Sequence, residues 1–86
     1  MEPEVAFGRA LRKLRKNRHM SQEVLAFEAG VERNYISLLE LGRNSASVKV
    51  IFKLAGALGL RPNQLIEAAE NEMPLSNGDL QQGPQP

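Results

Sequence analysis

The 86-residue chain contains no cysteine and no tryptophan, and it has only one histidine and one aspartate. Without cysteine, a disulfide framework, a thiol nucleophile and a thiolate metal site are all excluded. The histidine is His19, and the aspartate is Asp79, close to the C-terminal end. A Ser-His-Asp triad would therefore need a residue from that end of the chain. We expect this protein not to be an enzyme.

Motifs that bind nucleotides are also missing, and so are segments that span a membrane or direct secretion. The chain has neither a GxxxxGK phosphate loop nor a GxGxxG fingerprint. No apolar run approaches the roughly 20 residues that cross a bilayer. The first residues, Met1 to Glu4, are acidic, unlike a signal peptide. These absences predict a cytoplasmic binding module that has no membrane partner and needs no cofactor or metal.

The charges that are present are unevenly placed. The formal net charge is only +1, yet residues 9–18 hold six Lys and Arg residues and no acid. Four of these cations repeat with helical spacing opposite an apolar stripe; they are Arg9, Arg12, Lys13 and Lys16. We favour a solvated face that steers an anionic partner over direct phosphate contact. Arg18, at the end of this segment, is the strongest candidate for such a contact.

Apolar residues recur with the period of a helix along most of the chain, and no segment alternates with period two. The predicted helices span residues 4–17, 21–29, 33–41 and 48–58, and a short fifth helix opens at Pro62. Ser21 and Ser47 are suited to cap helices, and glycines follow the second, third and fourth segments. The inward residues expected in the last two helices are Val48, Ile51, Phe52, Ala55, Leu58, Leu65, Ile66 and Ala69.

The chain divides into two parts by composition. Residues 71–86 are rich in proline, glycine, glutamine and asparagine and have few apolar residues, which predicts a flexible C-terminal tail. Residues 1–70 then form the folded domain. A domain of this size buries only about 60% of its unfolded surface and is marginally stable alone.

Two of the predicted helices are separated only by residues 30–32, which contain a glycine. This spacing is typical of a helix-turn-helix, but an ordinary corner between two helices would have the same spacing. The outward face of the segment 33–41 favours the first interpretation. Arg33 and Asn34 can make bidentate contacts with guanine and adenine, and Leu38 can contact a thymine methyl group.

The stretch from Phe7 to Leu60 contains the motifs LRKLR, SQEVLAFEAGV, YISLLELGR and LAGALGL, followed by a helix that opens with proline. In this combination, the stretch resembles the Cro/repressor-type (XRE-like) helix-turn-helix family. Within that family, the ERNYIS run is similar to the controller proteins of restriction–modification systems. The resemblance implies an all-α, five-helix, lambda-repressor-like domain that binds operator DNA, usually as a symmetric dimer.

Candidate DNA-binding residues lie at the start of the second segment and along the third. Ser21 and Gln22 open a helix whose free N–H groups suit a phosphate, and the resemblance also implies a phosphate contact for Gln22. The alternative for Gln22 is an ordinary exposed position. We predict Arg33 and Asn34 as base readers, against the alternative of solvated surface. Tyr35 either packs beside the core or donates to a phosphate.

Two further pairs complete the predicted site. Arg43 and Asn44, in the loop after the recognition segment, would hold the DNA backbone on its other side. Arg15 and Glu40 both sit at the edges of apolar faces, and the family carries a buried ion pair at the matching positions. We expect such a pair to fix the geometry of its two helices more than to add stability.

The sequence thus predicts a sequence-specific DNA-binding transcriptional regulator. It would bind a roughly palindromic operator as a homodimer formed by the region after Ser47, with residues 33–41 in the major groove. No small-molecule ligand is expected. The alternative is an antitoxin-like protein-interaction module for which DNA binding is secondary. Apolar residues expected at or near the surface favour that alternative; they are Val24, Phe27, Leu38, Leu41 and Val50.

Overall fold

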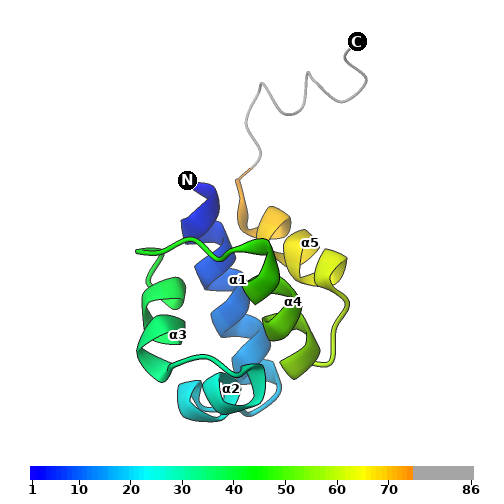
Figure 1. Ribbon diagram of the computed structural model, residues 1–86. Helices are drawn as coiled ribbons and strands as arrows, with labels where there is room; N and C mark the ends of the chain where they lie inside the picture. The colour runs from blue at the N-terminus through cyan, green and yellow to red at the C-terminus, as the bar shows by residue number, and fades with distance from the viewer. Residues whose placement is uncertain (75–86) are drawn as a thin grey trace.

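The computed structural model describes residues 1–74, and this part of the chain is built from five helices without a strand (Figure 1). The helices are α1 (Pro3–Asn17), α2 (Gln22–Ala29), α3 (Arg33–Glu40), α4 (Val48–Ala57) and α5 (Pro62–Glu72). The predicted all-α fold of five helices is confirmed. Within residues 1–74, no helix is long and apolar enough to cross a membrane.

One core is shared by all five helices. α1 lies at the centre of the bundle and packs against α3 and α5, while α2 packs against α3 and α4 (Figure 1). The largest fully buried side chains come from every helix or its C-cap; they are Leu11, Leu25, Ile36, Leu39, Leu54, Leu58 and Leu65. α3 therefore sits at one side of the bundle, held only by its inner face.

Capping serines and a glycine, which can be identified from the sequence, set the ends of the helices. The hydroxyl oxygens of Ser21 and Ser47 accept hydrogen bonds from the backbone N–H groups of Val24 and Val50, at 3.0 and 3.2 Å. Such caps satisfy donors that the first turn of a helix leaves without a partner. α2 ends at Gly30, whose φ of 72° is the left-handed conformation that glycine adopts at little cost.

Three inward positions predicted for α4 and α5 are wrong. Val48, Phe52 and Ile66 are 71%, 61% and 42% exposed, and Leu54, which was not in the predicted stripe, is fully buried. Apolar residues cover more than one face of α4, so periodicity alone does not tell which face meets the core. The structure leaves the second apolar face of α4 open to solvent.

The predicted domain boundary at residue 70 falls inside a helix. α5 continues through Asn71 to Glu72, and the carboxylate of Glu72 lies 2.7 Å from the ammonium of Lys13 on α1. This contact between α5 and α1 extends the folded part beyond the predicted limit. The rest of the predicted tail, from residue 75 onward, lies outside the described residues.

Candidate nucleic-acid interface

α2 and α3 are joined by a three-residue turn, residues 30–32, and pack against each other. The backbone N–H of Val31 donates to the carbonyl of Ala26 at 3.0 Å, which closes the end of α2 onto the turn. Glu32 then takes the N-cap position of α3, without a side-chain cap. The arrangement of the two helices is a helix-turn-helix.

α3 presents an open outer face. Only Ile36 and Leu39 are buried, whereas Arg33 and Asn34 are exposed in its first turn and Leu38 is half-buried. Because the buried residues already anchor the helix, the exposed side chains are available to a ligand. Arginine and asparagine at this place can form paired hydrogen bonds with base edges in a major groove.

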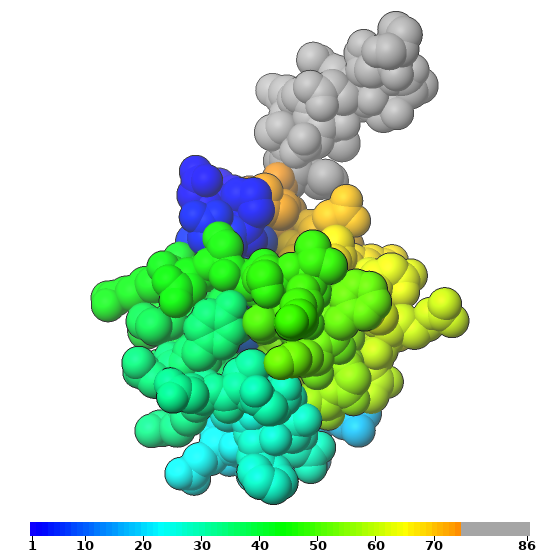
Figure 2. Space-filling model, in the orientation of Figure 1, coloured from blue at the N-terminus to red at the C-terminus, as the bar shows by residue number. Residues whose placement is uncertain are grey.

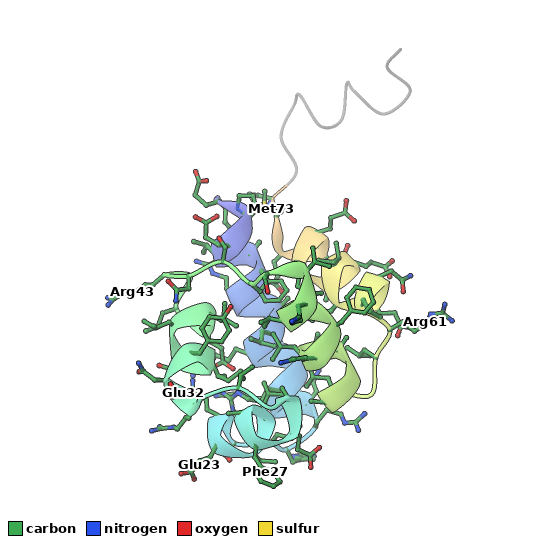
Figure 3. The ribbon with its side chains drawn as sticks, viewed as in Figure 1. Glu23, Phe27, Glu32, Arg43, Arg61 and Met73 are labelled. Atoms are coloured by element: carbon green, nitrogen blue, oxygen red, sulfur yellow. The ribbon has the colours of Figure 1, made fainter. Side chains whose placement is uncertain are left out.

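The loop after α3 extends the same edge of the molecule. Gly42, with a φ of 73°, ends the helix, and the N–H of Arg43 donates to the carbonyl of Leu38. Arg43 and Asn44 are both exposed. In Figure 3, Glu32 and Arg43 mark opposite ends of α3, and the Arg43 side chain extends outward from the edge. A cation there is placed to meet an anion lying along α3.

Tyr35 is half-buried and packs against the core. Its hydroxyl group donates to the carbonyl oxygen of Ser45 at 3.4 Å, a long hydrogen bond between α3 and the following loop. The structure thus shows Tyr35 packed beside the core, and its phosphate contact stays a prediction. This contact joins Tyr35 of α3 to the loop that follows the helix.

A buried polar cluster lies behind α3. The Arg15 guanidinium donates twice to the Glu40 carboxylate, from Nε to Oε2 at 2.6 Å and from Nη2 to Oε1 at 3.0 Å. Its Nη1 donates to the carbonyl of Met20 at 2.8 Å. The hydrogen bond with Glu40 raises the pKa of the Arg15 guanidinium, although burial acts in the opposite direction. This side chain therefore ties α1, the α1–α2 turn and α3 together.

The Gln22 side chain belongs to the same cluster. Its Nε2 donates to Oε1 of Glu40 at 3.0 Å, and the residue is half-buried rather than freely exposed. A side-chain amide carries two N–H donors and this hydrogen bond uses one of them, so the phosphate contact expected of Gln22 stays a prediction. Backbone donors at the start of α2 are free as well: Ser21 caps Val24, and no hydrogen bond within residues 1–74 uses the N–H groups of Gln22 and Glu23.

The sequence analysis did not identify Gly8, which decides how closely α1 can approach α3. A Cβ added at this position would lie 2.1 Å from the carbonyl oxygen of Leu39 and 2.9 Å from that of Glu40. Real Cβ atoms do not come this near to backbone. A single glycine in a helix adds nothing to the apolar periodicity. The sequence therefore gives no sign that another helix approaches Gly8 closely.

The cations of α1 lie outside the helix-turn-helix. Arg9, Arg12 and Lys16 are exposed on the outer side of α1. The Arg18 guanidinium lies beside Gly59, at the C-terminal end of α4, instead of beside α2 or α3.

Among residues 1–74, no group of three or more His, Cys, Asp or Glu side chains is placed to hold a metal ion.

Known proteins are similar to this chain in sequence. The helix-turn-helix family model matches residues 11–65. The control protein C.BamHI of Bacillus amyloliquefaciens is 42% identical over 62 residues, covering 71% of this chain and 76% of that protein. The control protein C.MunI of a Mycoplasma species is 33% identical over 70 residues, covering 80% of this chain and 95% of that protein.

Solved structures agree with the sequence comparisons. The restriction-modification controller protein C.AhdI from Aeromonas hydrophila has a TM-score of 0.71 and 44% identity, covering 72% of this chain and 94% of that one. The clp gene regulator ClgR from C. glutamicum has a TM-score of 0.82 and 29% identity, covering 88% of this chain and 99% of that one. The protein thus belongs to the helix-turn-helix family and is a DNA-binding transcription regulator of the XRE type, similar to restriction–modification controllers.

Proposed function

We propose that this protein regulates transcription as a homodimer that binds a roughly palindromic operator, with α3 in the major groove. The observation that carries this proposal is the exposed first turn of α3. There the side chains of Arg33 and Asn34 are open to solvent, while Ile36 and Leu39 anchor the same helix in the core. On one side of α3, the free N–H groups at the start of α2 suit a phosphate of the DNA backbone. On the other side of α3, Arg43 and Asn44 suit another phosphate.

A regulator of this kind needs no cofactor, no bound small molecule and no catalytic group. The side chains proposed here act only through hydrogen bonds and charge, with phosphate contacts giving affinity and base contacts giving specificity. We propose that it works in the cytoplasm, where operator DNA is accessible. Its affinity would fall steeply with salt, because phosphate contacts release counterions.

The exposed apolar face of α4 and α5 supports the proposed homodimer. Val48 and Phe52 are exposed on α4 and Ile66 on α5, and Ile66 also lines an apolar pocket of about 370 Å³ together with Ile51. Val48 and Phe52 are neighbours one turn apart on α4, and a small monomer seldom leaves such large side chains together in water. We call Val48, Phe52 and Ile66 the α4–α5 face. α4 and α5 lie on the side of the bundle away from α3 (Figure 1), so a second copy packed there would leave both α3 helices free.

Phe52→Glu is expected to convert the dimer into a monomer. Phe52 is 61% exposed, so the substitution leaves the core intact while it places a charge on the α4–α5 face. Sedimentation at micromolar concentration measures the oligomeric state. Phe27→Glu is the matched control, because Phe27 is even more exposed but lies on α2. A wild-type protein that stays monomeric both free and on DNA would contradict the proposed dimer.

Arg33→Ala should weaken binding to the preferred operator by about 1–3 kcal/mol and relax the preference at one position in each half-site. Arg43→Ala should instead weaken binding to all sequences by a similar factor, because Arg43 is placed to contact phosphate. Selection of sites from random DNA at one fixed salt concentration compares the two variants. Gln22→Ala is a poor control, since Gln22 also holds Glu40.

The same selection separates two roles for Arg33. If the guanidinium turns back onto a phosphate or pairs with neighbouring Glu32, its loss would lower affinity without changing the selected sequence. A selected sequence for Arg33→Ala that matches wild type would therefore assign base reading to Asn34 and Leu38 instead. It would leave the proposed placement of α3 in the groove unchanged.

A further inference from the structure

The outer side of α1 carries a dense run of positive charge. Between Glu4 and Glu23 the sequence has no acidic residue, and Arg9, Arg12 and Lys16 repeat along one side of the helix. All three are exposed, and no salt bridge within residues 1–74 involves them. Like charges three or four residues apart on a helix repel one another, so the domain gains no stability from this arrangement. We call Arg9, Arg12 and Lys16 the α1 basic face.

Two other cations of α1 have anionic partners inside the protein. Lys13 lies 2.7 Å from the carboxylate of Glu72, and the guanidinium of Arg15 holds Glu40 in the buried cluster. These two contacts join α1 to α5 and to α3. The α1 basic face takes no part in either contact, so its charge is available to an anion from outside the domain.

The α1 basic face and α3 point in different directions. Gly8 marks the side of α1 that packs against α3, because an added Cβ there would meet the carbonyl oxygens of Leu39 and Glu40. With about 100° of rotation per residue, Arg9 and Lys16 both lie about a quarter of a turn around α1 from Gly8. Figure 2 views the side of the molecule built from α2, α3 and α4, and it shows little of α1 between the ends of that helix. A straight duplex that lies along α3 therefore does not reach this face.

The chemistry of the α1 basic face suits the backbone of a double-stranded nucleic acid. No large apolar or aromatic side chain is exposed among residues 5–18. Single strands bind to aromatic side chains on which their bases stack, and a helix that lies on a membrane inserts apolar side chains. Protein interfaces also have apolar or aromatic residues at their centre. The phosphates of a duplex need only the cations that this face offers.

The length of the α1 basic face matches a short run of phosphates. Arg9 and Lys16 are seven positions apart in the chain, so about 10.5 Å of helix axis separates them. Each strand of B-DNA carries one phosphate per ~3.4 Å of the duplex axis, so this length spans about three phosphates of one strand. Two of the three cations are arginines, whose planar guanidinium can form paired hydrogen bonds with a phosphate. One face can thus neutralise about three phosphates.

We infer that the α1 basic face binds a second segment of double-stranded DNA, so that the operator-bound regulator bridges two duplexes. The inference rests on the proposed function for the operator end of this bridge. The second contact does not select a sequence, because contacts with phosphates carry no base information. It therefore ties the operator to whichever DNA segment lies nearby, and the proposed dimer has two such faces.

The test measures capture of a second duplex by the full-length protein on its operator. A short operator duplex, no longer than the selected site, is immobilised and saturated with protein, and a labelled duplex of random sequence is then added. Affinity for the random duplex should fall by about 40-fold between 50 and 200 mM salt, the dependence expected when about three phosphates release their counterions. A second label on the protein reports operator occupancy in the same sample.

A pair of double variants with equal charge isolates the α1 basic face. Arg9→Gln combined with Lys16→Gln should weaken capture by about 10-fold or more at 50 mM salt and reduce the salt slope to about one third. Glutamine is a good helix former, so α1 should keep its stability. Lys53→Gln combined with Arg61→Gln removes the same charge from exposed positions elsewhere and should leave capture unchanged. Gel shifts with the short operator should give the two double variants equal affinity.

Three results would overturn the inference. The first is an operator-bound wild type that captures no random duplex, and the second is an α1 double variant that captures it like wild type. The third is capture of phosphatidylglycerol vesicles in preference to the duplex. An α1 double variant that only associates more slowly with the operator would belong to the second case, because its cations would then steer DNA without holding it.

The proposed function can fail separately from this inference. In each of these three cases, an intact gel shift of the wild type with operator DNA would leave the proposed function standing. A wild type for which no operator can be selected would instead contradict the proposed function, whatever the α1 basic face binds.

Discussion

Arg15→Ala is expected to lower the free energy of unfolding by about 3–5 kcal/mol. The guanidinium side chain is 9% exposed and the Glu40 side chain 4% exposed, and their contact is as short as 2.6 Å. Removing Arg15 would leave the Glu40 carboxylate buried with only Gln22 as a partner. The same change would free the carbonyl of Met20 from its side-chain donor. Thermal and urea unfolding at one protein concentration measure the loss.

The matched control is the other ion pair of the described residues. Lys13 and Glu72 are just as close, at 2.7 Å, but the Lys13 side chain is 68% exposed. Lys13→Ala should therefore cost at most about 1 kcal/mol and should matter less at high salt. Comparing Arg15→Ala, Glu40→Ala and the double variant gives the coupling energy of the buried pair. Small, additive losses would show that the two residues do not depend on each other.

Gly8→Ala should destabilise the protein by about 3 kcal/mol or more, the upper range for overpacking. The added Cβ would meet two backbone carbonyls of α3, and backbone cannot turn aside as a side chain can. The strain would be relieved only if α3 moved away from α1. We therefore expect a lower melting temperature together with weaker operator binding, measured by calorimetry and gel shift.

Gly56→Ala is the control for this substitution. Gly56 is also inside a helix, but nothing lies within 4 Å of an added Cβ. Alanine is the better helix former, so stability should rise by about 0.5–1 kcal/mol. Gly8→Ala with wild-type stability would contradict the close packing of α1 on α3 that the structure shows.

The number and order of the helices could be predicted from sequence because their signals are local. Ser21 and Ser47 act as caps, Gly30 ends α2, and the apolar period runs without interruption between such signals. Each of these depends on residues within about one turn of the chain. The contact between Arg15 and Glu40 could be predicted for a different reason. Each charge lies at the edge of an apolar stripe and needs a partner, and the family resemblance implies that the two residues pair with each other.

What the sequence did not reveal depended on contacts between distant parts of the chain. The amide of Gln22 sits at a helix start that suits phosphate, but only the fold brings Glu40 within reach of it. Phe52 repeats with an apolar period, yet periodicity does not choose between two apolar faces of one helix. Gly8 gives no signal at all, because the relevant neighbour is a carbonyl on another helix.

The orientation of α3 rests on Glu40, Ile36 and Leu39, and none of these points outward from the recognition surface. The residues proposed to read DNA take no part in the core or in the buried polar cluster. Substitutions of Arg33 and Asn34 should consequently cost little folding stability, within about 0.5 kcal/mol. The scaffold and the sequence preference are therefore separable. One fold can be given a new operator by exchanging a few side chains on α3, without repacking its interior.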